Sequence, residues 1–358
     1  MSIRNPDAVV IGAGVVGLCA AAAIARRGLT VSIVGEARQG EASPAAAGML
    51  APLVERASGA AHEFALAARE YYPEYLELLA DESGIRVPLN RLGVLQVALT
   101  EAGVRGLKRA AASGSEWIDR AELAHMEPTL GHAIGAVLNP DDGSVDNVIL
   151  LAALSEVLSR TGRVDRVDGS VVAISREGGA WRAWLRSGEL VDANNLVLAP
   201  GAWGNQIKGA LRLSSVTPSR GQLLSFQSIG LRHVVYGPRG YLVPRSSGVT
   251  IAGSTMESSG FDASTTDEGL AKVRSAAEEI APGLAASTLK GAWAGLRPIT
   301  PDMLPLLGSE PDEPGLVYAC GHSRNGILLA PLTGEVVASI VAGEPVSHDL
   351  SQFRPARF

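Results

Sequence analysis

The residues near the N-terminus with the clearest chemical potential are the glycines of the segment Gly12-Ala13-Gly14-Val15-Val16-Gly17. Glycines at this spacing permit a tight turn, a close approach of the backbone to a pyrophosphate, and close packing of a helix on a strand. The free N–H groups at the start of the following helix, and its dipole, favour the phosphate charge. We therefore predict a dinucleotide site formed by Gly12, Gly14, Val15, Val16 and Gly17.

A dinucleotide site of this kind also needs an acidic residue about 20 positions further on, which binds the ribose hydroxyls. Here Val31-Ser32-Ile33-Val34 is followed by Gly35, and the acid, Glu36, comes one position late. Either the end of the strand is shifted, or another group holds the ribose. Glu36 is the candidate that the sequence offers.

The cysteines and histidines show no pattern of a metal or disulfide site. Cys19 and Cys320 lie near opposite ends of the chain, and the six histidines lack the spacing of metal ligands. Two distant cysteines also fit a reduced compartment better than a secreted scaffold. We expect no metal and a cytoplasmic location.

The elements around the glycines form a βαβ unit. Residues 8–11 are a short apolar run, which is typical of a buried parallel strand. Residues 15–27 form an alanine-rich helix that ends at Gly28, and residues 30–34 form a second strand. The crossover between the two strands is expected to be right-handed.

Apolar periodicity and turn residues predict the elements of the remaining chain. Helices are expected at 60–82, 101–127, 148–158, 267–280 and 328–341. Strands are expected at 87–98, 167–190, 196–199, 221–254 and 316–319. Asp146 stands at the N-cap position of the helix at 148–158.

Length, composition and charge limit the classes of partner. A chain of 358 residues with 46% hydrophobic content can bury the cores of two intertwined domains. A net charge of −6 argues against nucleic acid, whose phosphates the protein would repel. Glycines interrupt the apolar stretch 8–25, and no other segment approaches the ~20 apolar residues of a membrane span. We expect neither a nucleic-acid nor a membrane partner.

The glycine loop alone does not distinguish NAD from FAD. Small residues in Ala45-Ala46-Ala47-Gly48-Met49-Leu50 would let the chain pass close to a large flat cofactor. Far downstream, the strand at 196–199 ends in Pro200-Gly201-Ala202-Trp203, which can approach the same cofactor from another side. FAD lies extended along a fold and needs contacts from such distant segments, so we expect FAD.

Four segments in order make the chain resemble the D-amino-acid oxidase family of FAD-dependent oxidoreductases, and within it the glycine oxidases of thiamine biosynthesis. The segments are residues 45–50, Tyr241-Leu242-Val243-Pro244-Arg245, Trp293-Ala294-Gly295-Leu296-Arg297-Pro298, and residues 321–331. The similarity runs to residue 340. It implies an α/β fold in which a Rossmann-like FAD-binding domain (1–85, 140–222 and 296–358) is interleaved with an antiparallel α+β substrate-binding domain (86–139 and 223–295).

The resemblance implies roles for five residues at the substrate. Arg297 would bind the substrate carboxylate through a two-pronged pair, the geometry that a guanidinium provides best. The hydroxyl of Tyr241 would meet the same carboxylate, Arg324 would lie near flavin and substrate, and Met49 would lie against the flavin ring. Arg239 stands where such enzymes often have histidine, and could narrow the entrance or add a positive charge.

The resemblance also implies a set of FAD contacts beyond the glycine loop. They are Ala46, Ala47, Gly48, Met49, Val171, Gly201, Trp203, Arg324, Asn325, Gly326, Ile327 and Leu328. Asn325 to Leu328 begin the last helix, whose N–H groups would stabilise negative charge on the reduced flavin. Because no cysteine lies between Cys19 and Cys320, we expect the FAD to be bound non-covalently.

The implied reaction is oxidative deamination of glycine or another small amino acid by hydride transfer to flavin N5. The imino acid is hydrolysed to a 2-oxo acid and ammonia, and O₂ reoxidises the flavin to yield hydrogen peroxide. The expected partners are thus a small amino acid or amine and O₂, and the family suggests a homotetramer.

Several alternatives remain open from the sequence. The chain could be a D-amino-acid or sarcosine-type oxidase, a dehydrogenase with a non-oxygen acceptor, or a non-catalytic FAD- or NAD-binding module. Arg297 could form a structural ion pair, Tyr241 could be a sheet residue, and Arg324 a surface residue. His322 is more readily a packing residue than a general base.

Overall fold

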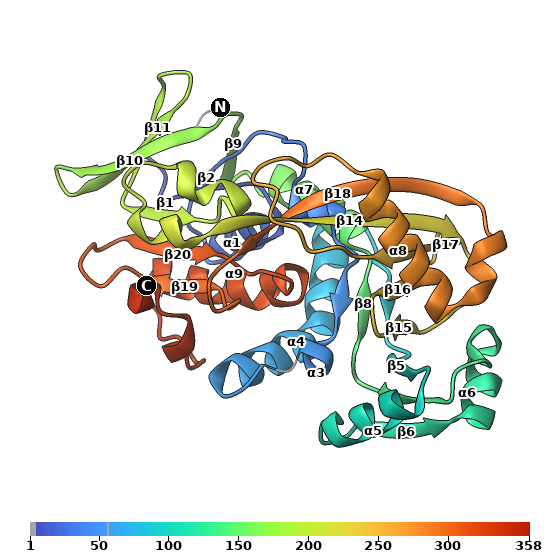
Figure 1. The fold of residues 1–358 in the computed structure, drawn as a ribbon. Helices are drawn as coiled ribbons and strands as arrows, with labels where there is room; N and C mark the ends of the chain where they lie inside the picture. The colour runs from blue at the N-terminus through green and yellow to red at the C-terminus, as the bar shows by residue number, and fades with distance from the viewer. Residues whose placement is uncertain (1–4, 56) are drawn as a thin grey trace.

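The computed structural model describes residues 5–55 and 57–358, which fold around two large β-sheets. Figure 1 shows the mostly parallel sheet on the left, together with helices α1 (Val15–Arg26) and α9 (Gly326–Ala342). The antiparallel sheet lies on the right with helix α8 (Asp267–Ile280).

The mostly parallel sheet has six strands in the order β19-β20-β13-β1-β2-β9. Their bounds are β1 (Ala8–Ile11), β2 (Val31–Val34), β9 (Val164–Val167), β13 (Asn195–Leu198), β19 (Leu306–Ser309) and β20 (Leu316–Cys320). Only β19 is antiparallel to its neighbour. This sheet and α1 confirm the predicted βαβ unit and the Rossmann-like fold class.

The parallel sheet is covered on both faces, which explains why its central strands, such as β1, are mostly apolar. Val10, on one face, belongs to the core shared with α1, α9, α4 (Ala60–Ser83) and α7 (Asn147–Arg160). Val9, on the other face, packs with a small antiparallel sheet. The strands of that sheet are β10 (Val171–Glu177), β11 (Ala180–Leu185) and β12 (Leu190–Ala193).

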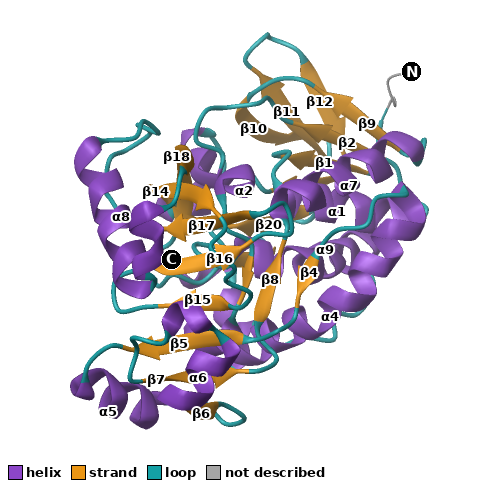
Figure 2. Cartoon of the chain, turned by 90° about the vertical axis from the view of Figure 1, so that its right-hand side faces the viewer, coloured by secondary structure: helices purple, strands orange, loops and turns teal. Residues whose placement is uncertain are grey.

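The second large sheet has eight strands in the order β18-β14-β17-β16-β15-β5-β7-β6. Their bounds are β5 (Val94–Ala98), β6 (Glu116–Asp119), β7 (Gly135–Asn139), β14 (Thr217–Gln227), β15 (Val234–Tyr236), β16 (Tyr241–Pro244), β17 (Val249–Gly253) and β18 (Leu289–Ile299). Adjacent strands in this sheet run antiparallel, except for the pair β5 and β15, which is parallel. Figure 2 shows this sheet beside the parallel one, and α8 packs against its strands β14, β16 and β17.

Shorter elements connect the two large sheets. The remaining strands are β3 (Met49–Leu50), β4 (Leu89–Asn90) and β8 (Gly143–Val145), which form one small sheet. The remaining helices are α2 (Ala42–Ala45), α3 (Pro52–Glu55), α5 (Glu101–Ala110) and α6 (Arg120–Met126). The 3₁₀ turns are η1 (Pro128–Leu130), η2 (Gly201–Gln206), η3 (Leu211–Ser215), η4 (Pro282–Ala286), η5 (Ser351–Phe353) and η6 (Pro355–Arg357).

The N-cap expected at Asp146 is confirmed. The prediction of one helix over 101–127 is wrong, because the middle of this segment is a strand. The Asp146 carboxylate accepts hydrogen bonds from the backbone N–H groups of Val148 and Ile149, both at 3.1 Å. Within 101–127, α5 and α6 are separated by strand β6. Helix α5 ends at Ala110, Gly114 then turns the chain with a φ of +85°, and β6 pairs with β7.

The predicted domain boundaries at 222/223 and 295/296 fall inside the long strands β14 and β18. These two strands pair with each other from Thr217 to Phe226 and from Leu289 to Ile299. The division into an FAD-binding and a substrate-binding domain stays a prediction.

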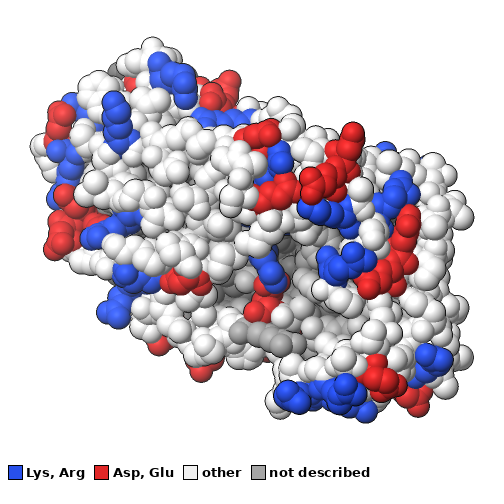
Figure 3. All heavy atoms as spheres, in the orientation of Figure 1, with Lys and Arg blue, Asp and Glu red and all other residues white. Residues whose placement is uncertain are grey.

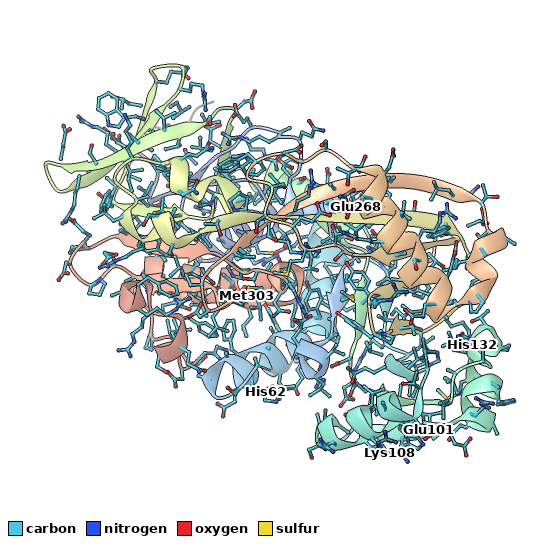
Figure 4. The ribbon with its side chains drawn as sticks, in the orientation of Figure 1. His62, Glu101, Lys108, His132, Glu268 and Met303 are labelled. Carbon is cyan, nitrogen blue, oxygen red and sulfur yellow. The ribbon has the colours of Figure 1, made fainter. Side chains whose placement is uncertain are left out.

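Across residues 5–55 and 57–358, no helix combines the length and apolar composition that a bilayer crossing requires. In the same residues, no three His, Cys, Asp or Glu side chains group as metal ligands would. Figure 4 shows His62 on α4 and His132 beside α6, in separate parts of the molecule.

Candidate active site

A single long cavity of about 450 Å³ connects the parallel sheet to the antiparallel sheet. Its walls come from segments spread over most of the chain. They include residues 11–16, 34–36, 38, 41–43, 45–49, 169–172, 199–203, 236–241, 254–256, 295–298, 319–324, 326 and 327, with a few single residues between them. On the face drawn in Figure 3, basic and acidic side chains are interspersed, and many of the arginines around the cavity are in fact paired.

The glycine loop forms part of the wall of this cavity, and close backbone contacts require glycine at two of its positions. A Cβ on Gly12, whose φ is +109°, would lie 2.1 Å from the Ala199 carbonyl oxygen. A Cβ on Gly17 would lie 1.8 Å from the Gly12 oxygen, so Gly17 packs helix on strand and does not line the cavity. Helix α1 begins at Val15, whose N–H donates to Ser43 Oγ at 3.0 Å.

The missing acid after β2 has a steric reason. A Cβ on Gly35 would lie 2.8 Å from the Ala13 Cβ and 2.9 Å from the Ala13 nitrogen, so a side chain there would displace the glycine loop. The acid therefore comes one residue later. Glu36 lines the cavity and pairs with Arg38 at 2.8 Å, and Arg38 in turn lies over the Trp203 ring at 5.2 Å.

Val171, Gly201 and Trp203 also line the cavity. Val171 begins β10, and Gly201 has a φ of +60°, which a glycine adopts at little cost. The structure thus brings the expected contacts from these two distant segments to the same cavity as the glycine loop.

The loop Ala46 to Met49 runs along the middle of the cavity and is anchored by two residues whose roles the sequence did not reveal. Arg245 donates to the Ala47 oxygen at 3.0 Å and to the Val145 oxygen at 2.6 Å. Trp293 Nε1 donates to the Ala45 oxygen at 2.9 Å. Gly48 needs to be glycine because a Cβ would lie 2.0 Å from the Val145 oxygen.

Only some of the residues expected to contact FAD at the start of α9, residues 324–328, line the cavity. Arg324, Gly326 and Ile327 line it, whereas Asn325 and Leu328 do not. The side chain of Leu328 is buried in the core, so any contact it makes would have to come from its backbone. Within the described residues, no side chain caps the N-terminus of α9.

His322 is buried beside this helix start and does not have the character of a base. Its Nε2 lies 3.1 Å from Thr333 Oγ1, and burial lowers the pKa of the imidazole to about 4. A ring with that pKa is neutral near pH 7 and a poor proton acceptor. This agrees with the packing role preferred from the sequence.

Arg297 and Tyr241 line another part of the cavity, where two glycines make room for them. A Cβ on Gly221 would lie 2.1 Å from Arg297 Nη1, and a Cβ on Gly253 would lie 2.3 Å from the Tyr241 hydroxyl. Sequence reasoning missed both glycines. Each faces its partner across a strand pair, a relation that appears only once the register is known.

The neighbours of Arg297 are neutral. Its Nη2 donates to Ser254 Oγ at 2.6 Å and its Nη1 to the Thr255 oxygen at 3.2 Å. Within the residues that the structure describes, no carboxylate pairs with it, so it does not form the structural ion pair considered above. A half-buried guanidinium of this kind can still accept a carboxylate ligand.

The other two arginines of the predicted substrate site each pair with a glutamate. Arg324 Nη2 lies 2.5 Å from Glu55 Oε2, and Arg239 Nε lies 2.7 Å from Glu279 Oε2. Arg239 is exposed at the rim of the cavity, and its guanidinium pairs with a residue of α8. Glu55 was not singled out by the sequence, because it lies 269 positions from Arg324.

The described residues fit FAD. Two helix starts without a side-chain cap of their own, those of α1 and α9, open into one cavity with positive dipole ends. A Cβ on Gly12 or Gly48 would meet a backbone carbonyl oxygen, so glycine is what lets each loop pass along the cavity wall as it does. An elongated anionic cofactor could therefore reach from the glycine loop past Met49 to the residues around Arg297.

Comparison with known proteins agrees with this geometry. The family model described as FAD dependent oxidoreductase (DAO) matches residues 7–340. The chain is 33% identical to a glycine oxidase from Bacillus licheniformis, over 97% of this chain and 95% of that protein. Its fold matches the crystal structure of glycine oxidase from Geobacillus kaustophilus with a TM-score of 0.93 and 30% identity, covering 99% and 100% of the two chains.

A longer relative carries a second part. The chain is 33% identical to the bifunctional protein ThiO/ThiG of a Synechocystis strain, covering 98% of this chain and 54% of that protein. The chain thus spans about half the length of this relative. Because the family model covers nearly all of the sequence, the chain belongs to the DAO family of FAD-dependent oxidoreductases.

Proposed function

We propose that the protein catalyses FAD-dependent oxidative deamination of glycine or another small amino acid. The observation that favours this most is the guanidinium of Arg297, which has only neutral partners among the described residues and faces the same cavity as the glycine loop. The glycine oxidases of similar sequence support the substrate class. Overall, amino acid, O₂ and water would yield 2-oxo acid, ammonia and hydrogen peroxide.

In this proposal the residues of the chain bind and orient. Arg297 holds the substrate carboxylate through two N–H donors, and the Tyr241 hydroxyl donates a further hydrogen bond to it. Met49 and the backbone of Gly48 position the middle of the cofactor. FAD, when bound, supplies the two-electron oxidation and passes the electrons to O₂.

The cofactor contacts are also part of the proposal. Gly12, Gly14, Val15 and Val16 would hold the pyrophosphate, Glu36 the ribose, and Val171 the adenine. Gly326 and Ile327 would donate N–H groups to the flavin, as would the backbone of Leu328. Cys320 lines the cavity, but burial raises the pKa of its thiol to about 12, which favours a non-covalent FAD.

Little acid–base machinery is needed in such a site. The substrate amine must be neutral to lose a hydride, and the positive charge of Arg297 disfavours a nearby ammonium group. Release of the substrate proton to solvent through the open mouth of the cavity would suffice. His322 would stay neutral and hold the loop before α9 through Thr333.

The test is anaerobic bleaching of the flavin by a panel of glycine, sarcosine, D-alanine and L-alanine. We expect bleaching by glycine or another of the small amino acids, and peroxide release once air is admitted. A protein that holds FAD but is bleached by no amino acid would contradict the proposal. Bleaching without peroxide release would place the protein among dehydrogenases that use another electron acceptor.

A further inference from the structure

The arginines predicted for the substrate site differ in whether a carboxylate of the protein already neutralises them. Arg297 has only neutral hydrogen-bond acceptors among the described residues. Arg324 is paired with Glu55, and Arg239 with Glu279. Among the arginines predicted for the substrate site, and within residues 5–55 and 57–358, Arg297 therefore offers a positive charge that no carboxylate of the protein neutralises.

Glu55 is placed to control the charge that a ligand meets inside the cavity. It ends helix α3, lines the cavity, and its side chain is 15% exposed against 46% for Arg324. Burial raises the pKa of the Tyr236 phenol well above its usual range, and the charge of Glu55 adds to that effect. Glu55 thus lies close to a tyrosine that also lines the cavity.

Arg324 belongs to the same neighbourhood as the predicted carboxylate site. Burial opposes its charge, but Glu55 together with Tyr236 and Tyr241 raises the pKa of Arg324. The ring of Tyr241 lies 5.6 Å from the ring of Tyr236. The Tyr241 hydroxyl approaches Gly253, the residue before Ser254, whose Oγ accepts a hydrogen bond from Arg297. Tyr241 thus lies near both Arg297 and the Arg324–Glu55 pair, so the two arginines belong to one part of the cavity.

We propose that Glu55 makes the site selective for amino acids with a single carboxylate, by occupying Arg324. This inference rests on the proposed function and adds a substrate class to it. A second carboxylate on the ligand would have to displace Glu55 from Arg324 or lie beside the Glu55 charge. Both are unfavourable, because like charges at short range repel and the displaced carboxylate would lose its partner.

Sarcosine and iminodiacetate form a suitable pair of substrates, since N-methylglycine and N-carboxymethylglycine differ by one carboxylate. In Glu55→Gln, Arg324 becomes available to the second carboxylate. We expect the ratio of kcat/KM for iminodiacetate over sarcosine to rise about tenfold to a hundredfold, the range of one charge-assisted hydrogen bond. If Glu55→Gln folds poorly, Glu55→Ala replaces it in the test, and we expect the same ratio to rise.

Binding without turnover provides a second readout. Methoxyacetate and diglycolate are the ether analogues of the two substrates and carry no oxidisable amine. Titration calorimetry on the FAD-loaded protein should show that Glu55→Gln tightens diglycolate by about tenfold or more relative to methoxyacetate. The double variant Glu55→Gln/Arg324→Gln should return the preference toward that of the unmodified protein.

Glu279→Gln is the matched control, because it releases Arg239 in an exposed pair at the rim. We expect it to change the substrate ratio by no more than about twofold. An equal rise in Glu279→Gln, or no rise in Glu55→Gln while the unmodified protein oxidises sarcosine or glycine, would overturn the inference. If the unmodified protein oxidises no amino acid, the proposed function itself is wrong.

Discussion

At the scale of single residues, the surroundings of a guanidinium decide what it can do. Arg297 is held in place by the neutral oxygens of Ser254 and Thr255, so its orientation is fixed and its charge is not neutralised by a protein carboxylate. Arg245 is also held by neutral oxygens, but it is buried in contacts that anchor the loop at Ala47. Only the first of these two arginines lines the cavity.

Replacing Arg297 by alanine should raise KM for the amino acid by roughly a hundredfold to a thousandfold, since an unpaired carboxylate would be left in the site. The FAD content should stay near that of the unmodified protein, because the glycine loop forms a different part of the cavity wall. Steady-state kinetics and the flavin-to-protein absorbance ratio test both points. The control is Arg86→Ala, which removes a side chain that is 82% exposed and should leave KM unchanged. A near-normal KM in Arg297→Ala would contradict the assignment of Arg297 to the substrate carboxylate.

Gly221 permits the position of Arg297, which leads to a second prediction. In Gly221→Ala the new methyl group would meet Arg297 Nη1 at 2.1 Å, and the flexible end of the arginine would move away. We expect KM to rise about tenfold or more while the melting temperature changes little, because no backbone atom needs to shift. Kinetics and thermal unfolding are measured side by side.

Gly283→Ala is the control for Gly221→Ala. A Cβ there would make only an ordinary contact with Ile229 at 3.9 Å, far from the cavity. KM should be unaffected in this variant. A fall in melting temperature of Gly221→Ala that parallels its rise in KM would show that the glycine supports the sheet rather than the guanidinium.

At the scale of elements, the two helices that begin at the cavity are packed against each other. A Cβ on Gly334 of α9 would lie 2.8 Å from the carbonyl carbon and oxygen of Cys19 in α1. The absence of a side chain there lets the helices approach closely, so their N-terminal ends can open into one cavity. The distance between the helix starts is thus set by packing well away from the ligand.

Gly334→Ala should lower the free energy of unfolding by about 1–3 kcal/mol, because the added methyl group overpacks the helix contact. Intrinsic propensity alone would favour alanine by about 1 kcal/mol. Gly106→Ala in α5 is the matched control, since nothing lies within 4 Å of a Cβ at that position, and it should be neutral or stabilising. Denaturant unfolding measures the free energy of unfolding of both variants. Equal changes in this free energy for Gly334→Ala and Gly106→Ala would contradict the packing argument.

At the scale of the whole molecule, the cavity joins parts that belong to different sheets. Its wall takes Gly12 from the loop after β1, Arg297 from β18 and Gly326 from the start of α9. A ligand that fills it would connect both sheets at once. The homo-oligomer and the cytoplasmic location suggested by the sequence stay predictions at this scale.

Removal of FAD should therefore lower the stability of the whole chain. At free FAD about 100 times its Kd, the free energy of unfolding should exceed that of the apoprotein by about 2.7 kcal/mol. Thermal unfolding of apoprotein with increasing FAD measures this, and NAD at the same concentrations should have no effect. Coincident unfolding curves with and without FAD would contradict a cofactor that bridges the two sheets.

Much of the fold was determined by the sequence alone, because its signals are local. The strand before Gly12 and the helix after Gly14 follow from short apolar runs and glycine spacing, and the cap at Asp146 needs only its neighbours. The small residues at 45–50 and the strand end at 200–203 already favoured FAD over NAD, and the order of the four family segments agreed with that prediction. Strand β6 was missed because its pairing with β7 outweighs the helical character of the residues around it.

Only the tertiary structure decided which residues stand together in the site. The partner of Arg324 is Glu55, 269 positions away, and the space for Arg297 comes from Gly221 on a neighbouring strand. The steric conflict with Ala13 explains Gly35, where the sequence alone left the reason open. Charge pairing and close approach depend on strand register and helix packing, which no local pattern of residues contains.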